Sequence, residues 1–145
     1  MSNALPKRMT LPEIKHCLIC EDIRLERRGL VSFMGVYGFT PHAGISVRNF
    51  KAPVGFCLVF TGDPIEGGFD IQLEIRAPDG TRIQATTVPE HNEQEFSKEL
   101  PCTFAFRVQA VFPGPDTYTM ILLASGAEFF KDKLYLTQGK ASDFA

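Results

Sequence analysis

The feature that most constrains this chain is the alternation of apolar and polar residues in short segments. It is clearest in residues 69–76, Phe-Asp-Ile-Gln-Leu-Glu-Ile-Arg, where every odd-numbered position is apolar and every even-numbered position is polar. Successive side chains of a β-strand point to opposite faces of a sheet, so this pattern is typical of a strand with one face on a core and one in water. Similar segments recur along most of the 145 residues and predict an all-β protein.

The alternating segments predict eight or nine strands, separated by turns rich in Gly, Pro and Asp. No segment has the period of an amphipathic helix. We therefore expect a single domain over residues 1–145, with an ordered core at about 12–138. The expected fold is a two-sheet antiparallel β-sandwich, immunoglobulin-like or jelly-roll-like, with a partly closed barrel as the alternative. The expected strands cover residues 14–23, 30–39, 45–47, 54–61, 69–77, 81–88, 101–112, 118–124 and 128–137.

Two of these strands are apolar on both faces, which is typical of a central position in a sheet. They are residues 30–39, apart from Ser32, and residues 118–124. Gly35 and Gly38 predict a bulge or a close backbone approach within the first of them. Tyr118 begins the second strand after a turn, where it predicts a tyrosine corner with its hydroxyl bonded back to the preceding loop.

The register of one hairpin can be predicted from its apolar face. A three-residue loop at 78–80 brings apolar residues opposite one another, whereas a two-residue loop places Ile75 opposite the polar Gln84. Gly80 suits the left-handed residue of the bulge that ends such a loop. The expected pairs are Ala77 with Thr81, Ile75 with Ile83 and Leu73 with Ala85.

Composition argues against several classes of partner. The net charge is −2, whereas nucleic-acid surfaces carry a basic excess, and the only arginine cluster is Arg24, Arg27 and Arg28. No segment approaches the roughly 20 apolar residues of a membrane span, and the N-terminus shows no apolar secretory segment. We expect a soluble, cytoplasmic protein that binds neither nucleic acid nor a membrane.

Four cysteines lie within or beside apolar stretches, at Cys17, Cys20, Cys57 and Cys102. This is the usual location of a buried free thiol. On a strand, Cys17 and Cys20 would lie about 10 Å apart on opposite faces. That separation is too large for a disulfide and unsuited to binding one metal ion, so we expect no metal and no cofactor.

No catalytic motif is present in the sequence. The three histidines, His16, His42 and His91, are far apart, although a catalytic set can assemble in space from distant positions. The two places to look for one are His16 beside Cys17 and His42 near the glycines of residues 30–39. We assign no catalytic residue.

Charged residues near the end of the first strand are weak candidates for a binding site. Glu21, Asp22 and Arg24 form a polar site there, or they are charges that guard an edge strand against aggregation. Glu21 and Asp22 are adjacent on a strand and point to opposite faces, so they cannot act as one acid–base pair without a bulge. The acidic residues of 88–100 are interpreted as a solvated connection and not as a calcium site.

Residues 19–24, Ile-Cys-Glu-Asp-Ile-Arg, and 29–38, Gly-Leu-Val-Ser-Phe-Met-Gly-Val-Tyr-Gly, resemble the opening of a bacterial family of small proteins known only as a domain of unknown function. The resemblance could cover about residues 14–137. It implies a bacterial, cytoplasmic, all-β protein. It implies no activity, ligand or catalytic residue.

A complete strand pattern without a catalytic set favours a non-enzymatic β-sandwich module that binds a protein partner or a second copy of itself. Phe39, Phe96 and Phe129 are apolar residues that the pattern does not require to be buried, so they are candidate contact points. His42 is a further candidate in the loop after residue 39. The alternative is a small-molecule or carbohydrate-binding domain, or a cryptic hydrolase, with its site at one end of the sandwich.

Overall fold

The computed structural model describes residues 13–27, 31–63, 67–68, 71–89, 95–96 and 102–140. These ranges contain strands and turns and no α-helix, which confirms the predicted all-β class. The strands are β1 (Ile14–Leu25), β2 (Val31–Phe39), β3 (Gly44–Val47), β4 (Val54–Gly62), β5 (Gly67–Gly68), β6 (Ile71–Arg76), β7 (Ala85–Pro89), β8 (Glu95–Phe96), β9 (Cys102–Ala110), β10 (Asp116–Ala124) and β11 (Ala127–Gln138).

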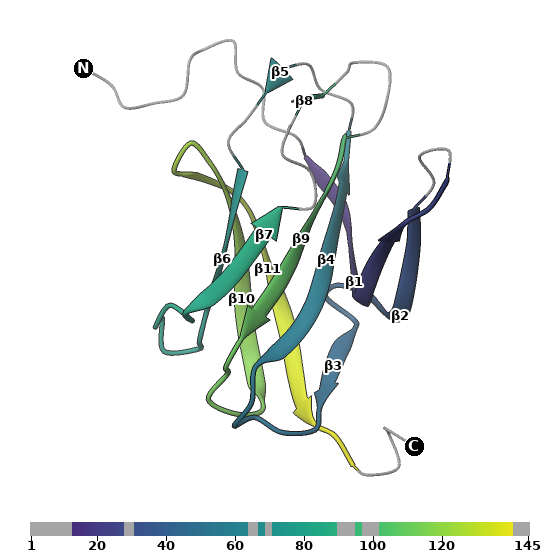
Figure 1. Ribbon diagram of the computed structural model, residues 1–145. Coiled ribbons are helices and arrows are strands. Elements are labelled where there is room, and N and C mark those ends of the chain that lie inside the picture. Colours follow the sequence, from purple (N-terminus) through teal and green to yellow (C-terminus); the bar gives the residue numbers. More distant parts are fainter. Residues whose placement is uncertain are drawn as a thin grey trace, which may run out of the picture.

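Two sheets pack face to face, which confirms the predicted β-sandwich (Figure 1). One sheet has the strand order β2-β1-β4-β9-β7, the other has the order β3-β11-β10-β6, and β5 pairs with β8 in a short ribbon. The sheets do not close into a barrel, so the alternative fold is excluded. All pairings are antiparallel except that of β3 with β11, which is parallel.

The core lies between the sheets and follows the period of two in each strand. Phe56, Leu58 and Phe60 of β4 are buried in it, as are Phe104 and Phe106 of β9. The Phe60 ring lies 5.5 Å from that of Phe104 and 6.3 Å from that of Phe106, measured between centroids. Aromatic side chains fill this space without burying a polar atom, which explains the use of Phe.

Two predictions about β10 are confirmed. The strand lies in the interior of its sheet, between β6 and β11, as its apolar character on both faces indicates. The hydroxyl of Tyr118 donates a hydrogen bond of 2.6 Å to the carbonyl oxygen of Gly114 and so forms the predicted tyrosine corner. This bond ties the start of β10 to the turn before it.

The prediction that residues 30–39 form a central strand is wrong. These residues form β2, which is the edge strand of the five-stranded sheet. Among the described strands β2 pairs with β1 alone, and Figure 1 shows this hairpin at one side of the sandwich. The apolar residues on both faces of this strand do not reflect burial, because several of them are exposed.

The 78–80 hairpin is partly as predicted. The amide of Ala77 donates to the carbonyl of Thr81 at 2.8 Å, and that of Ile83 donates to Ile75 at 2.8 Å, so the first two pairs are confirmed. The third pair is wrong, because Ala85 begins β7 and pairs with Ala110 of the other sheet. The chain crosses between the layers after residue 84, and this crossing ends the ladder with β6.

The expected surface connection at 88–100 falls mostly outside the described residues. Its described parts are the end of β7 and β8, whose residues 95–96 pair with Gly67 and Gly68 of β5. Within the described ranges, no helix combines the length and the apolar character needed to cross a membrane.

Candidate functional site

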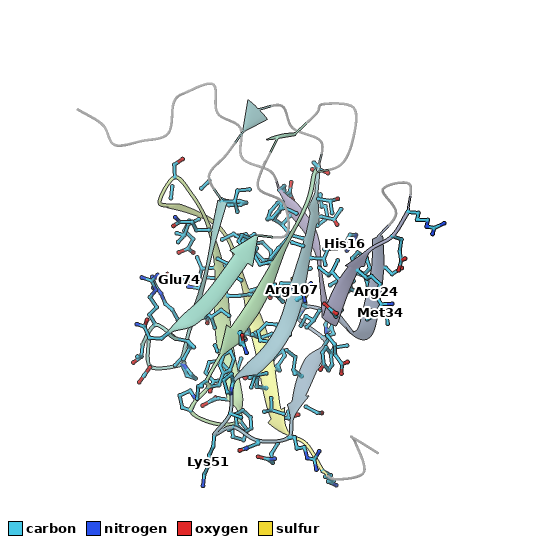
Figure 2. All side chains as sticks on the ribbon, in the orientation of Figure 1. His16, Arg24, Met34, Lys51, Glu74 and Arg107 are labelled. Atoms are coloured by element: carbon cyan, nitrogen blue, oxygen red, sulfur yellow. The ribbon has the colours of Figure 1, made fainter. Side chains whose placement is uncertain are left out.

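Strand β2 presents a group of exposed apolar side chains at the edge of its sheet. Phe33 is 42% exposed, Met34 40%, Val36 53% and Phe39 55%. Isolated exposed apolar residues are common on protein surfaces, but several on one strand mark a candidate interaction surface. We call these four residues the β2 surface, although Phe33 and Met34 are adjacent and so lie on opposite faces of the edge strand. Met34 is labelled on the hairpin in Figure 2.

The edge of β2 lacks the charges that usually keep strand edges apart. None of its nine residues is charged. The edge strand β6, by contrast, carries Glu74, which accepts a 2.8 Å contact from Arg76 and a 3.2 Å contact from Arg82. Figure 2 shows Glu74 on the opposite side of the sandwich from Met34. Charged side chains on an edge oppose pairing with another chain, so of these two edges β2 is the more open to a partner.

A bulge confirms the predicted role of the β2 glycines. The register with β1 shifts between Ile19 and Cys20, which pair with Gly38 and Val36, so Tyr37 is the extra residue. Gly35 has φ +62° and Gly38 has φ +134°, conformations that other residues rarely adopt. The bulge turns Tyr37 toward the main core, where it is half-buried.

Glu21 lies on the same part of the hairpin as Tyr37. The Tyr37 hydroxyl donates to Oε1 of Glu21 at 3.4 Å. Burial raises the pKa of Tyr37, and the neighbouring Glu21 carboxylate raises this pKa further. Glu21 thus satisfies the hydroxyl that the bulge brings over the core.

Asp22 faces away from Glu21 and forms an ion pair with Arg107 of β9. Nη2 of Arg107 also donates to the carbonyl oxygen of Ile23 at 3.1 Å. The hydrogen bond from Arg107 lowers the pKa of Asp22, and the backbone amide of Ile23 lowers it further. We call these contacts the Arg107 clasp, because they fasten the hairpin to a strand that β1 does not pair with.

The positions of the charged candidates change their interpretation. β1 is not an edge strand, because β2 lies outside it, so Glu21, Asp22 and Arg24 do not guard an edge of β1. Glu21 and Asp22 have separate partners, and Arg24 is exposed. Glu21 and Asp22 stabilise the hairpin that carries the β2 surface, and Arg24 lies exposed on it.

The aromatic residues selected from the sequence differ in their exposure. Phe39 belongs to the β2 surface and packs edge-on against the ring of His16, with centroids 5.9 Å apart. His42 is exposed next to it, and its amide donates to the Phe39 carbonyl at 3.1 Å. Phe129 is half-buried against the main core, and the side chain of Phe96 lies outside the described residues.

The described residues do not assemble a hydrolytic set. Within them, neither His16 nor His42 has a side-chain hydrogen bond to a thiol, hydroxyl or carboxylate, and His91 lies outside them. Cys17 is buried in the main core, and burial strongly raises the pKa of its thiol. No group of three or more potential metal ligands occurs in the part of the chain that is described.

Among the hollows on the described surface are the following three. One of about 350 Å³ lies at the end of the sandwich, between residues 77–79 and 113–116. Another, of about 440 Å³, lies beside Lys131 and Lys133, and a third, of about 260 Å³, lies beside Tyr37 and residues 45–49. No histidine or cysteine lines any of these three hollows, so they do not favour the hydrolase alternative.

Sequence reasoning selected Phe39 but missed Phe33, Met34 and Val36. Their pattern is indistinguishable from that of a buried central strand, so the sequence offered no signal of exposure. Sequence reasoning did not select Arg107 either. Its contact with Asp22 joins residues 85 positions apart and has no local signature.

Comparison with models of known protein families gave no match, and comparison with curated proteins gave none either. The resemblance of residues 19–38 to a bacterial family therefore stays a prediction. The candidate site rests on the geometry of the hairpin alone.

Proposed function

We propose that this chain is a non-enzymatic β-sandwich module that binds a strand of a protein partner at the edge of β2. In the first instance that partner is a second copy of the chain. The observation that carries the proposal is the β2 surface, four exposed apolar side chains on an uncharged edge strand. Addition of a strand to such an edge supplies main-chain hydrogen bonds and buries apolar side chains together.

A second copy is the first partner to consider because every copy carries the same unguarded edge. Antiparallel pairing of β2 with itself about a twofold axis brings no like charges together, since the strand has none. β6, an edge strand of the other sheet, carries charges and is a poorer competitor. A bacterial origin and a cytoplasmic location belong to the same proposal and are supported by the resemblance described above.

Two matched substitutions test the proposal. Val36→Glu places a charge in the β2 surface, and Val111→Glu places one at a residue that is 52% exposed and lies just after β9. Both positions are exposed, so we expect both variants to fold, with changes in stability within about 0.5 kcal/mol. Circular dichroism and thermal unfolding check this.

The measurement is sedimentation velocity over a wide range of protein concentration. We expect the wild type and Val111→Glu to self-associate and Val36→Glu to remain monomeric. Equal association of all three proteins overturns β2 as the interface. If all three proteins sediment as monomers, a second copy of the chain is not the partner. The β2 surface then remains the proposed interface only if a different protein binds the wild type and Val111→Glu but not Val36→Glu.

A further inference from the structure

Cys20 and Cys57 face each other across the pair of strands β1 and β4. They are register partners in this antiparallel pairing, and both are fully buried. The nearby Cys57 side chain adds to the burial that raises the pKa of Cys20. They belong to a small apolar cluster on the outer face of the five-stranded sheet, separate from the main core that contains Cys17.

The backbone places these two residues at a distance suited to a disulfide. Directly opposed residues of antiparallel strands have Cα atoms about 4.5–5.5 Å apart. Cα atoms joined by a disulfide are usually about 4.4–6.8 Å apart. The bond can therefore form between Cys20 and Cys57 without moving either strand. Cys17, on the opposite face of β1, has no such partner in its register position, where it faces Phe60.

We propose that Cys20 and Cys57 are a redox-modifiable pair that closes to a cross-strand disulfide by exchange with a low-molecular-weight disulfide, and that residues 21–23 of the β1–β2 hairpin gate this reaction. The pair lies on the outer face of the sheet, and its chemistry requires no partner at the β2 surface. The gate belongs to the hairpin that carries the β2 surface.

Residues 21–23, which follow Cys20 in the hairpin, cover the two thiols. Ile23 packs into the same cluster as the two cysteines, and Sγ of Cys57 lies 3.9 Å from the carbonyl oxygen of Glu21. Burial, together with the neighbouring Cys57, raises the pKa of Cys20 to about 11. The thiolate is the reacting form, so the covered pair reacts slowly until residues 21–23 move away from it.

The Arg107 clasp is the contact that holds this cover in place. Arg107 binds the carboxylate of Asp22 and the carbonyl oxygen of Ile23, so it contacts two consecutive residues of the hairpin. Loss of the guanidinium removes both contacts at once. The structure therefore predicts that Arg107 controls access of an oxidant to the two thiols.

The chemistry balances with one small disulfide per protein. One cysteine loses its proton, and its thiolate attacks the small disulfide, forming a mixed disulfide and releasing one small thiolate. The second cysteine then loses its proton and attacks the protein sulfur of the mixed disulfide, releasing the second small thiolate. Two protein thiols are oxidised, one small disulfide is reduced to two thiols, and an excess of small thiol reverses the reaction.

The test is a time course of the folded protein with excess oxidised glutathione at pH 8, stopped by acid, followed by alkylation, trypsin digestion and mass spectrometry. Trypsin leaves Cys17 and Cys20 together on residues 16–24 and Cys57 on residues 52–76. We expect a linkage of these two peptides with the loss of two hydrogen atoms. It should persist in Cys17→Ala and disappear in Cys20→Ala.

The gate is tested by Arg107→Ala against the control Arg76→Ala, which removes an arginine that binds Glu74 of β6. We expect linkage severalfold faster in Arg107→Ala and unchanged in Arg76→Ala. Equal rates in all three proteins overturn the gate. Absence of the 20–57 linkage in the wild type and in Arg107→Ala, with both folded by circular dichroism, overturns the redox pair. The redox pair is also overturned if disulfides that contain Cys17 or Cys102 form in the same yield as the Cys20–Cys57 disulfide.

Discussion

Asp22 and Arg107 form an ion pair across the outer face of the five-stranded sheet, with strand β4 lying between their own strands. Both side chains are about half exposed, and exposed ion pairs contribute little to global stability. The contact matters because Arg107 also binds the Ile23 carbonyl and so fixes the position of the hairpin. The β2 surface and the cover over Cys20 and Cys57 both depend on that position.

The ion pair predicts a pH dependence. The folded protein lowers the pKa of Asp22 below its ordinary value, so the stabilisation is fully present above about pH 4 and is lost as the pH falls through the lowered pKa. We expect Asp22→Asn to have a lower unfolding midpoint than the wild type at pH 6, and the difference to shrink toward zero on acidification below pH 4. Thermal unfolding of both proteins across this range measures it. A constant difference at all pH values contradicts the assignment to the Asp22 charge.

The tyrosine corner predicts a loss of stability without a change of fold. Tyr118 is buried, and its hydroxyl donates to the Gly114 carbonyl at 2.6 Å. Tyr118→Phe removes that bond and leaves the carbonyl without this partner, which costs about 1–2 kcal/mol, or roughly 4 °C in the unfolding midpoint. Tyr135→Phe is the control, because Tyr135 is only half-buried. Equal effects of the two substitutions would contradict the role of the corner.

The bulge predicts different costs for two glycine substitutions. A Cβ atom at Gly38, with φ +134°, would lie 2.9 Å from the Cβ of the buried Ala43. A Cβ atom at Gly80, with φ +91°, meets no atom within 4 Å. We expect Gly80→Ala to cost about 1–2 kcal/mol from backbone strain alone, and Gly38→Ala to cost about 1–3 kcal/mol more from crowding. Urea unfolding ranks the two, and the reverse order contradicts the packing at the bulge.

Truncation of a buried and of an exposed phenylalanine should lower the folding stability by very different amounts. Phe60 is buried against Phe104, Phe106 and Phe130, so Phe60→Ala should cost about 3–5 kcal/mol of folding free energy. Phe39 is 55% exposed, so Phe39→Ala should change stability by no more than about 0.5 kcal/mol. Denaturant unfolding measures both. A large loss in Phe39→Ala would show that this side chain supports the fold and does not belong to a free surface.

The strands, most of their inward faces and two turns could be predicted from the chain alone, because each depends on neighbouring residues. Alternation along β9 places Phe104, Phe106 and Val108 on one face, and all three are core residues, since a strand on a core buries every second side chain. Gly80 and Tyr118 were recognisable because their turn and corner involve residues only a few positions away.

The order of strands could not be predicted in this way. β2 and β10 show the same apolar character on both faces, yet one is an edge strand and the other lies inside its sheet. Whether a strand lies at an edge, and whether its faces are covered by another layer, depends on distant segments of the chain. The third pair of the 78–80 hairpin failed for the same reason, because β7 pairs with β9 of the other sheet.

The amino-acid pattern thus specified an all-β sandwich, its core-facing residues and its local turns. Burial of one face of a strand requires apolar residues at every second position, and this alternation can be read within each strand alone. Packing of distant strands specified the rest: the exposed edge at β2, the Arg107 clasp and the meeting of Cys20 with Cys57. Residues far apart in sequence come together only when the sheets assemble, so no local pattern records their contacts.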